Sequence, residues 1–233
     1  GDLNQKYPLI KNELLNSGIA SFVCRTSTPL TEIWSDTWSI VWEGKNPNDK
    51  TDFIHLSADE GLVKTAGLQI IQGRDMNLSE FPTDSSAVLL NEKAAKAMGF
   101  KNAVGQLIRN GDQTFHVVGV IKDFILGSPY EPIQPVFIEG SKSHNNFNVI
   151  NIKLSDRNGI GDNMKKTVML FRKYNPDYPF EYHFVDQAYA VKFDETKRTD
   201  NLAALLADLT ILISCLGLFG LASFVAAQRT QEI

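Results

Sequence analysis

Four histidines are the residues best suited to metal binding or nucleophilic catalysis, so their spacing is informative. His55, His116, His144 and His183 are each isolated in the chain. No HExxH motif occurs, and no second histidine or cysteine ligand follows at the third or fourth position, as a zinc site on a helix or turn requires. We therefore predict no metal site and no catalytic residue. We interpret each histidine as a surface side chain or a locally hydrogen-bonded one.

A second group of potential ligands lies in the stretch Asp156–Asp162, which reads DRNGIGD. It faintly resembles a calcium loop, but it lacks the third oxygen ligand before the glycine and the closing bidentate glutamate. We interpret it as a turn from a strand into the helix that follows. Glycine-rich phosphate loops are also absent from the sequence. We therefore expect no ATP site in this chain, no other cofactor and no enzyme activity.

Because the sequence shows no group of catalytic residues, its dominant feature is the apolar stretch Leu202–Ala227. Its one ionisable side chain is Asp208, and apolar or small residues cover every helical face. The roughly 19 uncharged positions that follow span about 28 Å as a helix, close to the roughly 30 Å hydrocarbon core of a bilayer. We predict a membrane-spanning helix over 202–227; the alternative is a helix buried in a core or an oligomer. The predicted spanning residues include Leu209, Ile213, Gly217, Gly220 and Phe224.

The composition is that of one apolar segment attached to an ordinary globular body. Hydrophobic residues make up 43% of the 233, yet the mean hydropathy is −0.16, so the apolar residues are concentrated. The formal net charge is −4, and no cluster of Lys and Arg is suited to phosphate, which excludes nucleic acid as a partner. Cys24 lies in a strand-like run and Cys215 in the apolar segment, so we expect no disulfide between them.

Local patterns predict a mixed α+β fold. Asn91 is predicted to cap a helix, and Asn110-Gly111-Asp112 is predicted to turn a β-hairpin. The segments 17–56 and 148–185 are expected to pack into one lobe, because each leaves an apolar helix face and only a small sheet.

Strands are predicted over 21–27, 38–42, 52–56, 87–90, 106–109, 114–121, 136–138, 148–154 and 180–185. Helices are predicted from Leu3 to Gly18, over 57–66, 92–98 and 160–174, and from 186 into the apolar segment. The helix over 160–174 has an apolar stripe of Ile160, Met164, Val168 and Phe171.

Several stretches of the chain together carry a resemblance to known proteins. The first group consists of Phe180–Asp186, Leu212–Phe224 and Gln228–Ile233. The second consists of Trp42-Glu43-Gly44, Gly67 to Asp75, Val88 to Glu92 with Ala94-Ala95, and Val118 to Phe124 followed by Pro135. Together they resemble the MacB-like/FtsX-like ABC transporter permeases, and the first group resembles the junction between the extracytoplasmic domain and the second transmembrane helix. Two departures are Ile125, where many relatives place a histidine, and Asp208 in the apolar helix.

The resemblance implies a two-lobed architecture with a porter-like α/β lobe that is discontinuous in sequence and an inserted β-rich lobe. The expected domains are 1–72 for the first part of the porter-like lobe, 73–135 for the inserted lobe and 136–185 for the second part. A stalk helix is expected over 186–201, the transmembrane helix over 202–227, and the start of a cytoplasmic loop over 228–233.

The resemblance also implies a function without an active site. The expected protein is the extracytoplasmic domain of a permease that transmits ATP-driven motion to export or extract a substrate; the alternative is a membrane-anchored ligand-binding or sensor domain. Its expected place is the bacterial inner membrane, with the main domain on the periplasmic side. The expected partners are a cytoplasmic ATPase subunit, a second permease copy, membrane lipid and a membrane-fusion or lipoprotein partner.

The matched residues each have a structural interpretation. Trp42 is interpreted as a packing residue, and an alternative for Arg74 and Asp75 is an ion pair that bridges the two lobes. The glycines interpreted as turn residues are Gly67, Gly73, Gly99 and Gly119.

Overall fold

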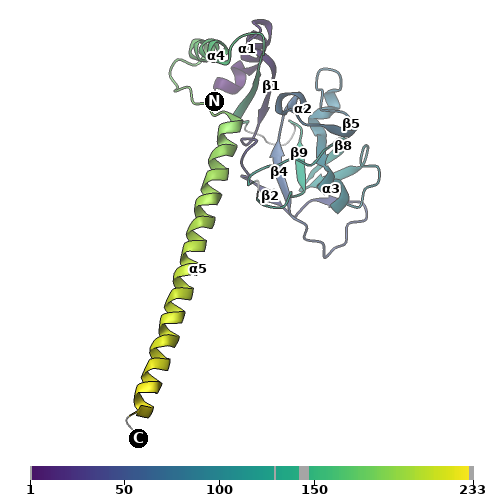
Figure 1. The fold of residues 1–233 in the computed structure, drawn as a ribbon. Helices are drawn as coiled ribbons and strands as arrows, with labels where there is room; N and C mark the ends of the chain where they lie inside the picture. The colour runs from purple at the N-terminus through teal and green to yellow at the C-terminus, as the bar shows by residue number, and fades with distance from the viewer. Residues whose placement is uncertain (1, 129, 142–146, 231–233) are drawn as a thin grey trace. The chain divides into compact units, whose positions relative to one another are not determined.

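The computed structural model describes residues 2–128, 130–141 and 147–230. The chain forms two compact units, Gly1–Val185 and Asp186–Ile233. Figure 1 shows their helices and strands. The α+β class and the long C-terminal helix are confirmed.

Helices and strands alternate irregularly along the chain. The helices are α1 (Asp2–Asn16), α2 (Leu62–Ala66), α3 (Glu92–Ala97), α4 (Ile160–Tyr174) and α5 (Val185–Thr230), with the 3₁₀ turn η1 (Pro82–Ser86). The strands are β1 (Ala20–Thr26), β2 (Asp36–Thr37), β3 (Val41–Trp42), β4 (Phe53–Ser57), β5 (Ile70–Gly73), β6 (Ala87–Asn91), β7 (Leu107–Asn110), β8 (Gln113–Ile121), β9 (Val136–Glu139) and β10 (Val149–Leu154).

The largest element is an eight-stranded sheet in the order β2-β4-β9-β6-β8-β7-β3, with β5 paired to β8 beside this path. Its end strands β2 and β3 are separated in sequence only by Trp38–Ile40. The sheet therefore has to curl until its two ends approach, and we call it the curled sheet. One face carries a core that includes the fully buried rings of Phe115 and Phe137. These rings meet edge-on with centroids 5.8 Å apart, a geometry that aromatic quadrupoles favour.

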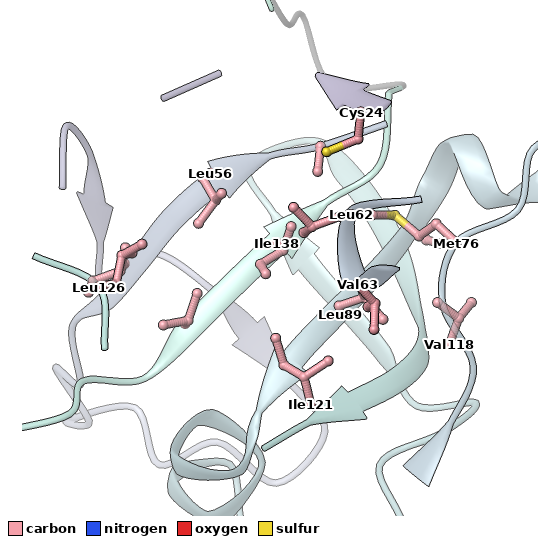
Figure 2. Packing of buried hydrophobic residues seen from close by; sticks show 14 residues of the cluster. Cys24, Leu56, Leu62, Val63, Met76, Leu89, Val118, Ile121, Leu126 and Ile138 are labelled. Atoms are coloured by element: carbon pink, nitrogen blue, oxygen red, sulfur yellow. The ribbon is translucent and has the colours of Figure 1, made fainter. Parts of the chain in front are cut away.

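The other face of the curled sheet packs against α2 and β1. Leu56 and Ile138 of the sheet lie in one cluster with Leu62 and Val63 of α2, and Cys24 of β1 belongs to the same cluster (Figure 2). Burial raises the pKa of the Cys24 thiol to about 12. The strand β1 therefore shares its core with the curled sheet.

A second group of elements consists of α1, β1, β10 and α4, which we call the α1–α4 layer. β1 and β10 pair antiparallel from Ala20 opposite Leu154 to Thr26 opposite Val149. Ile10 and Leu14 of α1 share a buried cluster with Phe171 of α4. The expected packing of 17–56 with 148–185 is thus confirmed for β1 and β10. It is wrong for β2, β3 and β4, which belong to the curled sheet.

The buried face of α4 shares only Phe171 with the predicted stripe, and Met164 and Val168 of that stripe are half-buried. The buried residues of α4 are Asn163, Thr167, Leu170 and Phe171, whereas Ile160 is 66% exposed. The polar members of this face are satisfied locally, because Asn163 Nδ2 donates to the Ser155 carbonyl and Thr167 Oγ1 donates to the Asn163 carbonyl, each at 2.8 Å. The buried face of α4 therefore combines hydrogen-bonded polar side chains with the apolar Leu170 and Phe171.

The predicted strand over 180–185 is wrong. Residues 180–184 have no regular secondary structure, and α5 begins at Val185. Phe180 packs instead on Phe171 of α4, with ring centroids 5.0 Å apart, and Tyr182 packs on Phe180 at 5.7 Å. The alternating aromatic residues are thus stacked on each other and on a helix rather than paired in a sheet.

The expected domain boundaries at 72/73 and 135/136 fall inside the curled sheet, because β2, β3 and β4 precede the first boundary and β9 follows the second. In sequence, every strand of this sheet lies between β1 and β10. The division of the chain into lobes itself stays a prediction.

Local predictions around α3 and the turns are mostly confirmed. Asn91 Oδ1 accepts the Ala94 N–H at 2.9 Å and the Val136 N–H at 2.8 Å, while Nδ2 donates to the Gln134 carbonyl at 2.9 Å. The cap therefore also fastens α3 to the start of β9.

The turn interpretation holds for two of the four matched glycines. Gly67 and Gly99 lie in turns and have positive φ angles. Gly73 also has a positive φ angle, but it is the last residue of β5. Gly119 instead lies within β8 opposite Gly73, and a Cβ there would lie 2.3 Å from the Arg74 carbonyl oxygen. Its role is close backbone approach, and the turn interpretation is wrong. Trp42 is buried against Phe53, as predicted.

Candidate functional site

The histidines lie beside carboxylates or at the surface. His55 Nε2 lies 2.9 Å from Glu139 Oε2, at an angle that makes no hydrogen bond, and His116 Nε2 lies 3.8 Å from Asp84 Oδ1. His183 is exposed, and His144 lies outside the described residues. Among the residues that the structure describes, no group of three or more His, Cys, Asp or Glu could hold a metal ion.

The stretch Asp156–Asp162 is the turn that the sequence predicts. β10 ends at Leu154 and α4 begins at Ile160. Asp162 lies in the first turn of α4, where a carboxylate interacts favourably with the helix dipole.

The C-terminal helix α5 is continuous over 46 residues, from Val185 to Thr230. Within it, Asn201–Ala222 is long and apolar enough to cross a membrane, with a mean hydropathy of 2.3 and no burial. The hydroxyls of Thr210 and Ser214 donate to carbonyls four residues earlier, each at 2.8 Å. These polar groups are thus satisfied inside the helix, which is what a bilayer requires of a spanning segment.

The predicted spanning residues all lie on α5. Leu209 is 51% exposed and Ile213 is 60% exposed, and no other atom lies within 4 Å of a Cβ built at Gly217 or Gly220. The side chain of Phe224 lies outside the described side chains. The assignment of these five residues to a membrane-spanning segment remains a prediction.

In the unit Gly1–Val185, an ion pair joins β1 to the segment between β4 and α2. Asp59 accepts the Arg25 backbone N–H at 2.6 Å and Arg25 Nε at 3.0 Å. The Arg25 guanidinium lies between the rings of Tyr7 and Phe147, 4.0 and 4.4 Å from their centroids. Burial raises the pKa of Asp59, and the hydrogen bonds from Arg25 oppose that effect. This contact fixes the α1–α4 layer to the curled sheet.

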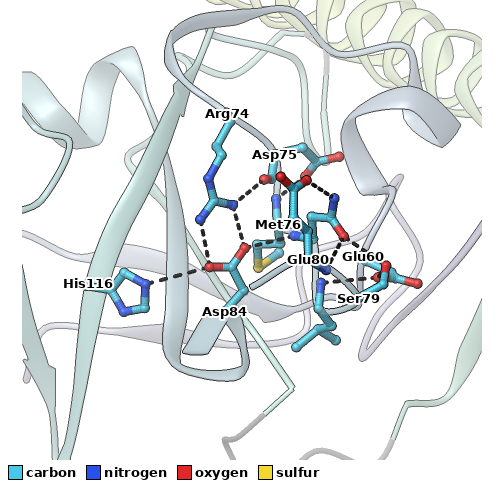
Figure 3. A network of polar contacts seen from close by, with 10 residues as sticks. Glu60, Arg74, Asp75, Met76, Ser79, Glu80, Asp84 and His116 are labelled. Carbon is cyan, nitrogen blue, oxygen red and sulfur yellow. Dashed lines mark hydrogen bonds and ion pairs between the residues drawn. The ribbon is translucent and has the colours of Figure 1, made fainter. Parts of the chain in front are cut away.

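Glu60 makes a second connection beside the first. Its Oε1 lies 3.2 Å from Lys11 Nζ of α1, and its Oε2 accepts the Leu78 N–H at 3.1 Å. Oε2 also accepts the Ser79 hydroxyl at 3.3 Å (Figure 3). Burial opposes the charge on Glu60, but Lys11 and the Ser79 hydrogen bonds outweigh it and lower the pKa. One carboxylate therefore holds α1 and the loop before η1 together.

Arg74 pairs with Asp84 and not with Asp75. Both terminal nitrogens of Arg74 donate to the Asp84 carboxylate, which also accepts the Asn77 N–H at 2.8 Å (Figure 3). The guanidinium lies 3.9 Å from the centroid of the Phe81 ring.

The Asp75 carboxylate accepts backbone N–H groups, from Val63 of α2 at 3.1 Å and from Met76 at 2.8 Å. The alternative of an ion pair between Arg74 and Asp75 is therefore wrong. Although Arg74 and Asp75 are adjacent in the sequence, they belong to separate hydrogen-bond networks.

In these three networks, charged side chains hold backbone segments in place. Their hydrogen bonds go to main-chain groups and to neighbouring side chains. Sequence reasoning singled out Arg74 but not Asp84, Arg25, Asp59 or Glu60 as partners. No local signal could have found them, because each pair joins residues that are 10 to 49 positions apart.

Comparisons with known proteins identify the family of this domain. The sequence model of the MacB-like periplasmic core domain matches residues 24–174. No curated protein matches the chain.

Two solved structures are similar in fold. The periplasmic region of MacB from Actinobacillus actinomycetemcomitans superposes with a TM-score of 0.52 at 17% identity, covering 71% of this chain and 72% of that one. The extracellular domain of the noncanonic ABC-type transporter YknZ from Gram-positive bacteria gives 0.51 at 15% identity, covering 72% and 83%.

Proposed function

The chain belongs to the family of MacB-like periplasmic core domains, and from this membership we propose that it passes ATP-driven motion across a membrane. In this proposal it is the extracytoplasmic domain of an ABC transporter permease, followed by a transmembrane helix. The motion would come from a cytoplasmic ATPase subunit and would export or extract a substrate. The two similar structures, one from a MacB and one from an ABC-type transporter, support this assignment.

The observation that carries the proposal is the continuity of α5. One helix begins at Val185 and continues through the candidate span Asn201–Ala222. The 16 residues before the span would form a stalk of about 24 Å. Because its backbone hydrogen bonds make a helix stiff, displacement at the membrane would be transmitted along this stalk.

The ion pairs of the outer unit support the same mechanism. Arg25–Asp59 and Lys11–Glu60 join the α1–α4 layer to the curled sheet, so the outer unit would respond to the stalk as one body. We further propose that the α1–α4 layer is the porter-like lobe and that the curled sheet with α2 and α3 is the inserted lobe.

The proposed place is the bacterial inner membrane, with the unit Gly1–Val185 on the periplasmic side. A second permease copy and membrane lipid would contact the spanning helix, and a membrane-fusion or lipoprotein partner would meet the outer unit. None of these roles needs a catalytic residue.

The test is a flexible joint in the stalk of the full-length permease. Thr199→Gly together with Asp200→Gly should destabilise the helix locally by about 1 kcal/mol per residue relative to alanine at the same positions. The matched control, Thr199→Ala with Asp200→Ala, changes the same positions but keeps a strong helix former. We expect the glycine variant to lose transport while ATP hydrolysis and folding persist, and the alanine variant to keep both. Normal transport in the glycine variant would contradict the lever and favour a passively anchored sensor.

A further inference from the structure

The strand β10 pairs with a neighbour on only one of its two edges. That neighbour is β1, and the two strands form a sheet of their own. The Arg25 N–H and carbonyl of β1 bond to Asp59, on the side of β1 that faces away from β10. Bonded positions alternate along an antiparallel pair, so Ile150, opposite Arg25, and then Ile152 and Leu154 direct their backbone groups to the free edge. In the part of the chain that the structure describes, these backbone groups have no hydrogen-bond partner.

The side chains along this edge are apolar and only half-buried. Ile150, Ile152 and Leu154 pack against the cluster that α1 and α4 share. Val23, opposite Ile152 on β1, belongs to the same cluster and is 3% exposed. The difference arises because β1 lies between β10 and the segment before α2, whereas β10 ends the sheet. Natural proteins usually cover such an edge or place charges along it, because it can accept a further strand.

An apolar groove runs along the flank of α4 next to its buried face. Leu170 and Phe171 of α4 belong to the cluster against which β10 packs, and Met164 and Val168 on the adjoining flank line the groove. The opposite wall includes Tyr182 and Phe184, which lie in one stack with ring centroids 5.6 Å apart. The groove has a volume of about 670 Å³, and its one charged lining residue is Lys165. It therefore suits apolar side chains.

Residues 180–184 form the wall of the groove without being a strand. They follow β10 and α4 in the order of a βαβ unit, and their aromatic residues alternate as in a strand. In a split βαβ unit, the two strands that the helix connects leave room for another strand. Residues 180–184 are held by their rings, and they belong to no sheet. The free edge, the groove and the unpaired segment are thus all consistent with one missing strand.

We propose that an extended segment of a partner protein adds as a strand to the free edge of β10. The segment runs antiparallel to β10 and exchanges backbone hydrogen bonds with Ile150, Ile152 and Leu154, and its apolar side chains at alternate positions face α4. Its other face lies opposite Lys153, which is exposed and forms no salt bridge among the described residues. An acidic residue of the partner fits there as a cross-strand pair. The inference rests on the proposed function only for its setting, in which a partner protein meets the outer unit.

The experiment uses the full chain in phosphatidylcholine nanodiscs and the blocked peptide Thr-Val-Glu-Val-Thr-Val-Thr. In the antiparallel register its valines lie opposite Leu154, Ile152 and Ile150, and its glutamate lies opposite Lys153. Two further peptides replace three N–H groups by ester oxygens, either at the valines or at the glutamate and the two threonines after it. Only the valine N–H groups face β10.

Calorimetric titration, corrected with empty nanodiscs, compares the three peptides. Esters at the valines should weaken binding at least about tenfold, because three hydrogen bonds are lost. Esters at the other positions should weaken it less than about threefold. No binding of the unmodified peptide, or an equal loss with both sets of esters, would overturn the proposal.

A charge exchange tests the register. Wild type should bind the peptide with glutamate at the third position about threefold more tightly than one with lysine there, and Lys153→Glu should reverse this preference. The matched control is Lys101→Glu, which changes the net charge equally at an exposed position of the curled-sheet side and should keep the wild-type preference. An unchanged preference in Lys153→Glu, or a reversal in the control, would overturn the proposal.

A polar groove should also bind the peptide less well. Met164→Gln with Val168→Thr should weaken binding about fivefold, because the valines lose apolar contacts. The control pair, Val104→Thr with Leu107→Gln, makes the same kind of change at exposed apolar positions elsewhere and should change affinity less than about twofold. Equal effects of the two pairs would contradict the proposed site.

Thermal unfolding of each variant checks that it is folded, and the ester peptides decide the question on the unaltered chain should a variant fail. The titration contains no ATPase. A failed peptide experiment therefore leaves the lever proposal standing, and a failed stalk experiment leaves this one standing.

Discussion

Replacing Asp84 with asparagine removes the charge at the centre of the loop network with little change in shape. The Asp84 side chain is fully buried and accepts three hydrogen bonds, two from Arg74 and one from the Asn77 N–H. Breaking a buried ion pair costs about 3–5 kcal/mol. The Arg74 side chain is 39% exposed and keeps much of its hydration, so we expect a loss of about 2–3 kcal/mol at pH 7.

The assay is urea unfolding of the outer unit followed by tryptophan emission. All three tryptophans lie in the unit Gly1–Val185, and Trp42 is buried in its core. Asp156→Asn is the matched control, because Asp156 is exposed; its free energy of unfolding should change by less than about 0.5 kcal/mol.

The pH dependence provides a second check. Burial alone would raise the pKa of Asp84, but Arg74 and the Asn77 N–H outweigh it and lower the pKa. A carboxyl with a lowered pKa in the folded state stabilises the fold above its unfolded pKa, and this contribution disappears as the pH falls through the folded pKa. The difference between wild type and Asp84→Asn should therefore shrink below about pH 4. Equal stability at pH 7, or a deficit that stays constant down to pH 3, would refute the reasoning.

Three further predictions concern folding and association. Asn91→Ala should lower the free energy of unfolding by about 2–4 kcal/mol, because it removes a cap and two contacts to the start of β9, and Asn91→Asp should cost less because it keeps the acceptor; urea unfolding measures both. Gly73→Ala should destabilise more than Gly18→Ala, since a Cβ at Gly73 would lie 2.2 Å from the Val118 carbonyl oxygen while Gly18 has open space at a similar φ; the two denaturation midpoints decide this. In sedimentation without detergent, the chain should self-associate and a version ending at Asp200 should be monomeric, because the exposed apolar helix far exceeds the patches tolerated on monomers. Two monomeric forms would contradict the exposed-span interpretation.

The sequence alone determined the features that depend on neighbouring residues. The Asn91 cap is an interaction between a side chain and a backbone N–H three residues later. The turn at Gly111 and the helix from Val185 onward likewise depend on local backbone preferences and on apolar content. Such interactions span one helical turn or one hairpin, so residue types and spacing are sufficient to predict them.

The tertiary structure decided which segments meet. Nothing local distinguishes β5, which the sequence pattern does not predict, or shows that β4 pairs with β9 while β1 pairs with β10. The strand predicted over 180–185 has the right alternation but finds aromatic partners on α4 instead of a neighbouring strand. Arg74 lies next to Asp75 in the sequence, yet its carboxylate partner is Asp84. Sheet pairing and buried ion pairs join residues that are far apart in the chain. Which residues pair depends on how all the apolar faces are buried and all the charges are satisfied together. No short window of sequence contains that information.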